Sequence, residues 1–161
     1  MPKAELGKKL PDFSLPASGA AHPTWSLAKD GPAAQGQKLV IYFYPKDMTS
    51  GCTRESQDFR DQHAAFRRLK TQVIGISRDS LASHDKFRQK ESLPFPLLSD
   101  ADEKICRLFD VIREKNMYGR KVMGIERSTF LIDSKGVLKQ EWRKVKVPGH
   151  VEEVLEAAKS L

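Results

Sequence analysis

Short apolar runs alternate along the chain with longer stretches in which apolar residues recur at helical spacing. The runs at 38–44 and 72–77 are rich in β-branched residues, which is typical of strands buried on both faces of a sheet. The run at 128–133 leads through a Ser-Lys-Gly turn into 137–142, which predicts a hairpin. Helices are predicted over the amphipathic segments 50–69, 80–91, 102–109 and 151–161.

This order of elements predicts an α/β fold. Helical crossovers imply parallel neighbouring strands, and the late hairpin adds an antiparallel edge, so we expect a central mixed sheet flanked by helices. Residues 1–37, rich in Gly, Pro, Ser and Ala, are expected to be irregular or to form a short hairpin. Residues 113–124 show no clear period and are expected to form a long loop. With no linker or repeat, residues 1–161 are expected to form a single domain.

The composition adds a positive charge without pointing to an anionic partner. Lys plus Arg number 28 and Asp plus Glu number 21, which gives a formal net charge of +7. Basic residues are scattered along the chain, several of them beside acidic ones, and the densest basic run, 143–146, reads equally well as an exposed strand edge. No zinc-finger, helix-turn-helix or RNA-binding signature is present. We therefore expect a solvated surface that binds neither nucleic acid nor a membrane.

Cysteine usage and hydropathy indicate the compartment. Two cysteines are too few for a secreted disulfide framework. No apolar run approaches the roughly 18 residues of a membrane span, and the first residues lack the apolar core of a signal peptide. We expect a cytoplasmic protein.

The most informative segment leads into a helix that carries Cys52. A buried strand ends at Pro45, the chain turns, and a helix begins with Thr49 or Ser50 at its cap and Cys52 in its first turn. A helix N-terminus carries partial positive charge and unpaired N–H groups, which favour a thiolate. Phe59 falls on the same helix face, so Cys52 faces inward at the end of the sheet. From position alone, Cys52 could equally be a small buried apolar residue.

Other cysteine chemistries fit the sequence less well. Cys52 has no Cys-x-x-Cys partner, so a thioredoxin-type dithiol is not expected. His63 lies about 16 Å along the same helix, too far to act as a base for Cys52. The remaining histidines show no zinc-ligand spacing. We expect no metal and no cofactor.

At this point the sequence resembles a known family. The pattern Pro45-x-x-x-Thr49-x-x-Cys52 resembles the peroxidatic motif of the peroxiredoxins, and residues 42–55 resemble its bacterioferritin comigratory protein, or Q-type, subfamily. Segments 75–79, 95–100 and 124–130 agree in matching order, so the likeness covers nearly the whole chain from about residue 5. The resemblance implies a thioredoxin-like fold and an antioxidant activity, the reduction of hydrogen peroxide or organic hydroperoxides.

The resemblance also implies roles for five residues. The Cys52 thiolate attacks a peroxide oxygen and becomes a sulfenic acid. The Thr49 hydroxyl holds the peroxide in line with the sulfur, while Arg127 stabilises the thiolate and donates to the peroxide oxygens. Pro45 packs over the thiolate and restricts water. Glu55, one turn beyond Cys52, orients Arg127 through a charge-assisted hydrogen bond.

The sequence departs from the subfamily at the resolving cysteine. Many members carry it five residues after the peroxidatic one, where this chain has Gln57, and others carry it within the segment matching 83–90, which has none. The remaining thiol is Cys106. It is either a core residue, in which case thioredoxin, glutaredoxin or a small-molecule thiol reduces the sulfenic acid, or it reaches Cys52 by local unfolding to form a disulfide. The first reading is favoured.

The resemblance also suggests that the protein is a monomer. The alternative function is a non-enzymatic basic binding protein on a thioredoxin-like scaffold, which would bind nucleic acid in a salt-sensitive way that does not depend on Cys52.

Overall fold

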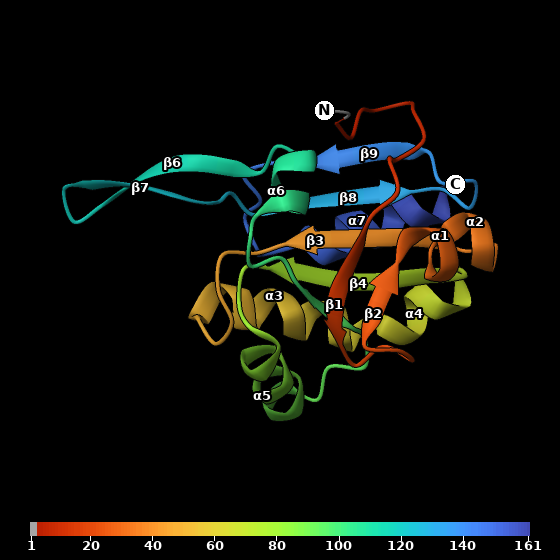
Figure 1. The fold of residues 1–161 in the computed structure, drawn as a ribbon. Helices are drawn as coiled ribbons and strands as arrows, with labels where there is room; N and C mark the ends of the chain where they lie inside the picture. Colours follow the sequence, from red (N-terminus) through yellow and green to blue (C-terminus); the bar gives the residue numbers. More distant parts are fainter. Residues whose placement is uncertain (1–2) are drawn as a thin grey trace.

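The computed structural model describes residues 3–161 and has a seven-stranded mixed sheet at its centre (Figure 1). The strand order is β2-β1-β5-β4-β3-β8-β9, and β4 pairs in parallel with both β3 and β5. The strands of this sheet are β1 (Ser14–Ser18), β2 (Thr24–Ser26), β3 (Lys38–Phe43), β4 (Thr71–Ser77), β5 (Leu97–Ser99), β8 (Ser128–Ile132) and β9 (Leu138–Trp142). The helices are α1 (Leu27–Asp30), α2 (Pro32–Gln35), α3 (Ser50–Asp61), α4 (His63–Arg68), α5 (Leu81–Glu91), α6 (Lys104–Leu108) and α7 (His150–Lys159).

Strand β3 divides the interior into two hydrophobic clusters, one on each face of the sheet. Because side chains alternate along a strand, Leu39 and Ile41 join the first cluster, whereas Val40 and Tyr42 join the second. The N-terminal segment and α6 cover the first face, and helices α3, α4, α5 and α7 contribute to the second. The prediction that this strand is buried on both faces is confirmed.

The other long elements follow the sequence pattern closely. Six elements begin and end within two residues of their predicted bounds, namely strands β4, β8 and β9 and helices α5, α6 and α7. The helix predicted over 50–69 is two helices, since the backbone of Gln62 (φ −99°, ψ 5°) leaves helical geometry between α3 and α4. The apolar period continues across this break, and for that reason periodicity could not reveal it.

Two segments without a clear sequence pattern form β-hairpins. The expectation of a long loop over 113–124 is wrong. This segment forms the hairpin of β6 (Ile112–Met117) and β7 (Arg120–Ile125), which projects from the rest of the molecule (Figure 1). Its two turn residues, Tyr118 and Gly119, have positive φ, as tight hairpins require. Much of the hairpin is exposed, so no buried face imposes an alternating pattern. The N-terminal lead-in does form a short hairpin, β1–β2, and the three-residue strand β5 was not predicted.

No helix within residues 3–161 combines the length and the apolarity that crossing a membrane would need.

Candidate active site

The loop between β3 and α3 presents Cys52 at the end of the sheet. Met48 has a left-handed backbone (φ 64°), which turns the chain towards the helix, and Thr49 is the N-cap residue in an extended conformation. The Thr49 carbonyl accepts the first helical bond from the Thr53 N–H at 2.8 Å. Cys52 is the third residue of α3, and its side chain is buried with Phe59. Both the helix-start position and the inward orientation are confirmed.

Arg127 contacts the Cys52 sulfur directly. Its Nη2 donates to Cys52 Sγ over 3.3 Å, and its Nη1 donates to Glu55 Oε1 over 2.7 Å. The sheet register explains the meeting, because Phe43 at the end of β3 pairs with Ser128 at the start of β8. The residue before β8 therefore lies beside the helix that follows β3. The structure brings together three of the residues that the sequence singled out.

Glu55 is a buried acid that holds the guanidinium. Its side chain has no exposed surface, and Oε2 has no hydrogen-bond partner among the described residues. Burial raises the pKa of Glu55 to about 7, while the Arg127 guanidinium acts in the opposite direction. Burial would lower the pKa of Arg127, but the Glu55 and Cys52 side chains outweigh it and raise that pKa. The bidentate use of Arg127 fixes the direction of its donors.

Gly51 makes room for this arrangement, a role that sequence reasoning did not assign. A Cβ atom at Gly51 would lie 3.1 Å from Arg127 Nη2. That distance is shorter than ordinary van der Waals contact, so any side chain would press on the guanidinium. The glycine in the motif was the available signal, since a glycine within a helical pattern often marks a close approach.

Pro45 and Thr49 lie near the two ends of the loop that joins β3 to α3. The Thr49 hydroxyl donates to the Lys46 carbonyl over 2.8 Å, which leaves the oxygen lone pairs of Thr49 as acceptors. Pro45 is half-buried directly after β3 and Tyr44. Thr49 is exposed at the start of α3, three residues before Cys52.

Cys106 lies on the other face of the sheet. It is fully buried in the cluster with Ile41 and Phe109, whereas Cys52 belongs to the cluster with Val40 and Phe59. Both thiols are free. Burial, followed by the Asp100 carboxylate, raises the pKa of the Cys106 thiol far above its ordinary value. In this fold the sheet separates the two sulfurs.

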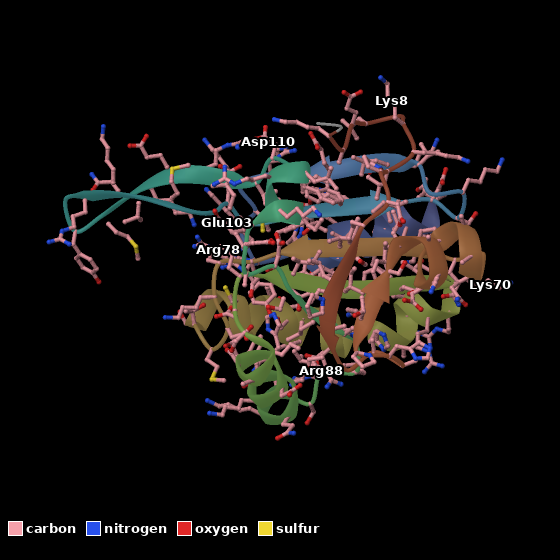
Figure 2. The ribbon with its side chains drawn as sticks, viewed as in Figure 1. Lys8, Lys70, Arg78, Arg88, Glu103 and Asp110 are labelled. Atoms are coloured by element: carbon pink, nitrogen blue, oxygen red, sulfur yellow. The ribbon has the colours of Figure 1, made fainter. Side chains whose placement is uncertain are left out.

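The positive charge is dispersed over the molecule. Lys8, Lys70 and Arg88 lie at well-separated places around the surface (Figure 2). In the densest basic run, Arg143 donates to the carbonyls of Phe109 and Asp110 over 3.0 and 2.8 Å, so part of that run makes contacts inside the protein. This use of Arg143 weakens the nucleic-acid-binding alternative.

One group of potential metal ligands occurs within the described part of the chain. It consists of Asp47, Asp79 and His84, which come from three separate segments, so their sequence spacing could not reveal it. Hydrogen bonds within the protein already engage the grouped atoms. The cluster therefore reads as a polar network beside the active-site loop.

Comparisons with known proteins identify the family of this chain. The AhpC/TSA family matches residues 6–141. Peroxiredoxin Bcp of Xanthomonas campestris is 51% identical over 92% of this chain and 90% of its own length, and peroxiredoxin Bcp of Bacillus subtilis is 48% identical over 98% and 96%. The solved structure of Xanthomonas campestris peroxiredoxin Q has a TM-score of 0.83 at 51% identity over 92% and 90% of the two chains.

A PrxQ mutant of Xylella fastidiosa has a TM-score of 0.88 at 43% identity, covering 98% of this chain and 96% of its own. Both solved structures share the thioredoxin-like mixed sheet expected from the sequence. The family match covers well over half of the chain. The chain therefore belongs to the AhpC/TSA family, among the peroxiredoxins of the Bcp or Q type, and is a thiol-dependent peroxidase.

Proposed function

We propose that Cys52 is the nucleophile of this peroxidase and that Arg127, Thr49 and Pro45 form the rest of its catalytic site. The observation that carries the proposal is the 3.3 Å hydrogen bond from Arg127 Nη2 to Cys52 Sγ in the first turn of α3. A guanidinium and a helix N-terminus both stabilise a thiolate, which is the reactive form of cysteine. The substrate class is hydrogen peroxide and organic hydroperoxides.

The chemical step moves charge from sulfur to oxygen. The Cys52 sulfur bonds to one peroxide oxygen while the O–O bond breaks, and the electron pair leaves on the other oxygen. That oxygen takes up a proton and departs as water or an alcohol, and the sulfur becomes a sulfenic acid. Because Arg127 already points at the sulfur, its donors can follow the charge onto the departing oxygen without reorganisation. Thr49 accepts the peroxide hydrogen, and Pro45 limits the access of water.

We further propose that the cycle uses one cysteine, with an external thiol as the reductant. That thiol attacks the sulfenic sulfur and releases water, and a second thiol resolves the mixed disulfide. Two features support this proposal, namely the position of Cys106 across the sheet and the raised pKa of its thiol. Thioredoxin, glutaredoxin and a small-molecule thiol all fit the requirement. We also propose that the protein is a soluble monomer that works in the cytoplasm.

The decisive experiment is the intact mass of the protein after one equivalent of peroxide, without added thiol. A gain of one oxygen in the wild type and in Cys106→Ser, but not in Cys52→Ser, is the expected result. Peroxide consumption at the wild-type rate by Cys52→Ser would refute the proposed nucleophile. A loss of two hydrogens in the wild type would instead show a disulfide between Cys52 and Cys106 and refute the one-cysteine cycle.

A further inference from the structure

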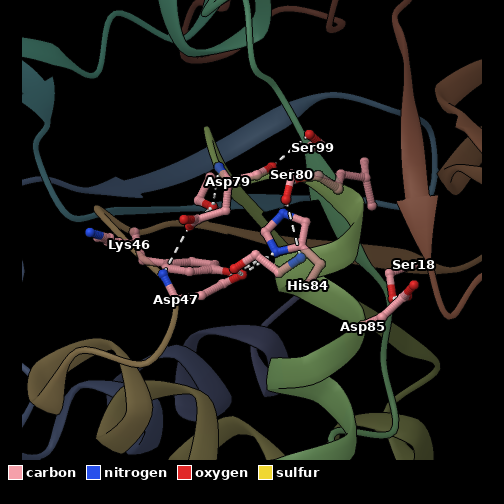
Figure 3. A network of polar contacts seen from close by, with 12 residues as sticks. Ser18, Lys46, Asp47, Asp79, Ser80, His84, Asp85 and Ser99 are labelled. Carbon is pink, nitrogen blue, oxygen red and sulfur yellow. Dashed lines mark hydrogen bonds and ion pairs between the residues drawn. The ribbon is translucent and has the colours of Figure 1, made fainter.

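A buried polar network anchors the active-site loop at Asp47 (Figure 3). The Asp47 backbone N–H donates to Asp79 Oδ2 over 2.8 Å, and its side chain faces His84 on α5. His84 Nδ1 lies 2.7 Å from Asp47 Oδ2, and both side chains are almost completely buried. Asp47 thus ties the loop to two elements that the catalytic residues do not come from.

Hydrogen bonds hold both side chains of this pair in place. His84 Nε2 lies 3.0 Å from the Leu98 carbonyl, which can only accept, so Nε2 carries a hydrogen. The Asp47 carboxylate accepts from the Tyr44 hydroxyl at 2.6 Å and from the Ser83 hydroxyl at 2.8 Å, as well as from His84 Nδ1. His84 therefore contacts Asp47 through one ring nitrogen and the Leu98 carbonyl through the other.

Such a pair fixes the position of Asp47 more than it adds to the free energy of folding. Removing polar or charged groups from water costs about as much as their mutual attraction returns, so a buried pair of this kind contributes little net free energy of folding. Its hydrogen bonds are directional, however, and those from Tyr44, Ser83 and His84 engage both oxygens of the Asp47 carboxylate. Because Tyr44 precedes the loop whereas Ser83 and His84 lie on α5, Asp47 cannot shift without breaking contacts on both sides.

The loop transmits this restraint to the catalytic groups. Lys46, next to Asp47, supplies the carbonyl that accepts the Thr49 hydroxyl hydrogen. Met48, on the other side of Asp47, adopts the left-handed conformation that leads into Thr49 and α3. Moving Asp47 therefore moves both the Thr49 side chain and the start of the helix that carries Cys52.

We propose that His84 is a positioning residue, which acts through Asp47 to hold Thr49 in line for the attack of Cys52 on the peroxide. The proposal rests on the proposed function of the same site and adds two residues to it. The proposal predicts different effects on two reactions of Cys52, its alkylation and its reduction of peroxide. Alkylation of the sulfur needs only an accessible thiolate, whereas peroxide reduction also needs the Thr49 hydroxyl in place.

Two substitutions of His84 test this role, since each preserves one of its two donors. His84→Asn keeps a donor at the place of Nδ1, towards Asp47, and His84→Gln keeps one at the place of Nε2, towards Leu98. We expect kcat/KM for peroxide to fall about tenfold or more in His84→Gln and less than about threefold in His84→Asn, because a small misplacement of reacting groups is costly. The rate at which iodoacetamide alkylates Cys52, followed by mass spectrometry, should stay within about twofold of the wild type in both variants.

Ser83→Ala provides a milder variant that keeps His84 in place. It removes one hydrogen bond to Asp47 from a half-buried residue on α5, and we expect about a threefold fall in kcat/KM with unchanged alkylation. Wild-type kcat/KM in both His84→Gln and Ser83→Ala would overturn the proposal. So would equal losses in the two His84 variants with parallel losses of alkylation, which indicate a packing role. A wild-type protein that reduces no peroxide would refute the proposed function instead.

Discussion

Cys52 and Cys106 occupy nearly the same local position in the chain and have opposite surroundings. Each is the third residue of a helix, and each is almost completely buried. At α3, the N-cap residue Thr49 makes no side-chain cap hydrogen bond, and a guanidinium donates to the sulfur. At α6, the Asp100 carboxylate accepts from the Ile105 and Cys106 N–H groups over 3.2 and 2.7 Å.

This difference shows that a helix N-terminus does not by itself make a cysteine reactive. The first-turn N–H groups favour a thiolate only if no other anion uses them. At α6 the Asp100 carboxylate uses these N–H groups. Burial raises the pKa of Cys106, and the negative charge of Asp100 raises it further. At α3, Arg127 supplies the opposite charge. Both thiols are buried in the first turn of a helix, so the charged group beside each sulfur is what differs between them.

The strongest way to break this comparison is to remove Arg127. In Arg127→Gln we expect the rate of the first turnover with peroxide to fall about 100-fold or more, since removing a donor aimed at developing charge typically costs that much. Stopped-flow peroxide consumption with the enzyme in excess over peroxide measures this rate. Arg143→Gln is the matched control, because Arg143 contacts carbonyls away from the sulfur. A rate in Arg127→Gln within twofold of wild type would contradict the electrostatic account.

Two buried groups on the Cys52 face have pKa values shifted in opposite directions. On the Cys52 face, the pKa of Glu55 is raised to about 7 by burial, and the pKa of His150 is lowered to about 4, by burial first and by Arg127 second. A raised pKa stabilises the fold below the ordinary value of the group and loses that effect as pH rises through 7. A lowered His150 pKa stabilises it above about 6.5 and loses that effect as pH falls towards 4. The two contributions oppose each other between about pH 4.5 and 6.5.

Glu55→Gln should therefore expose the His150 contribution. We expect the free energy of unfolding of this variant to fall more steeply from pH 7 to pH 4.5 than that of the wild type, by about 2 kcal/mol over the interval. Urea denaturation at several pH values measures the slope. His150→Asn, which keeps a polar side chain beside Thr129, should show the opposite deviation. Identical pH slopes in all three proteins would show that neither group titrates as described.

Asp100 offers a test on the other face. Asp100→Asn weakens the cap of α6, because its side chain can accept from only one of the two N–H groups. We expect a loss of about 1–2 kcal/mol in the free energy of unfolding, with first-turnover peroxidase activity within about twofold of wild type. A large loss of activity without a loss of stability would mean that the two faces are coupled.

The sequence predicts the two cysteines unequally well, for physical reasons. The strand, the turn and the helix start around Cys52 are local features, so periodicity and propensity locate them. The contact with Arg127, 75 residues away, depends on the pairing of Phe43 with Ser128, and only the family resemblance pointed to it. The network of Asp47 and His84 had no such signal, since strand order decides which segments meet. The hairpin of β6 and β7 was missed because most of its side chains face solvent.

The smallest expected effect is that of Cys106→Ala. Replacing a buried thiol by a methyl group leaves a small cavity, so we expect a loss of about 1 kcal/mol in the free energy of unfolding. The first turnover should be unchanged, because the Cys106 sulfur lies on the opposite face from Cys52. Steady-state turnover with thioredoxin or a small thiol separates the two possible cycles. If Cys106→Ala keeps its first turnover but loses steady-state turnover, then Cys106 resolves the sulfenic acid and the sheet must open in each cycle. If both rates persist, the carboxylate beside Cys106 keeps that thiol out of the chemistry, and the difference between the two helix starts accounts for the use of a single cysteine.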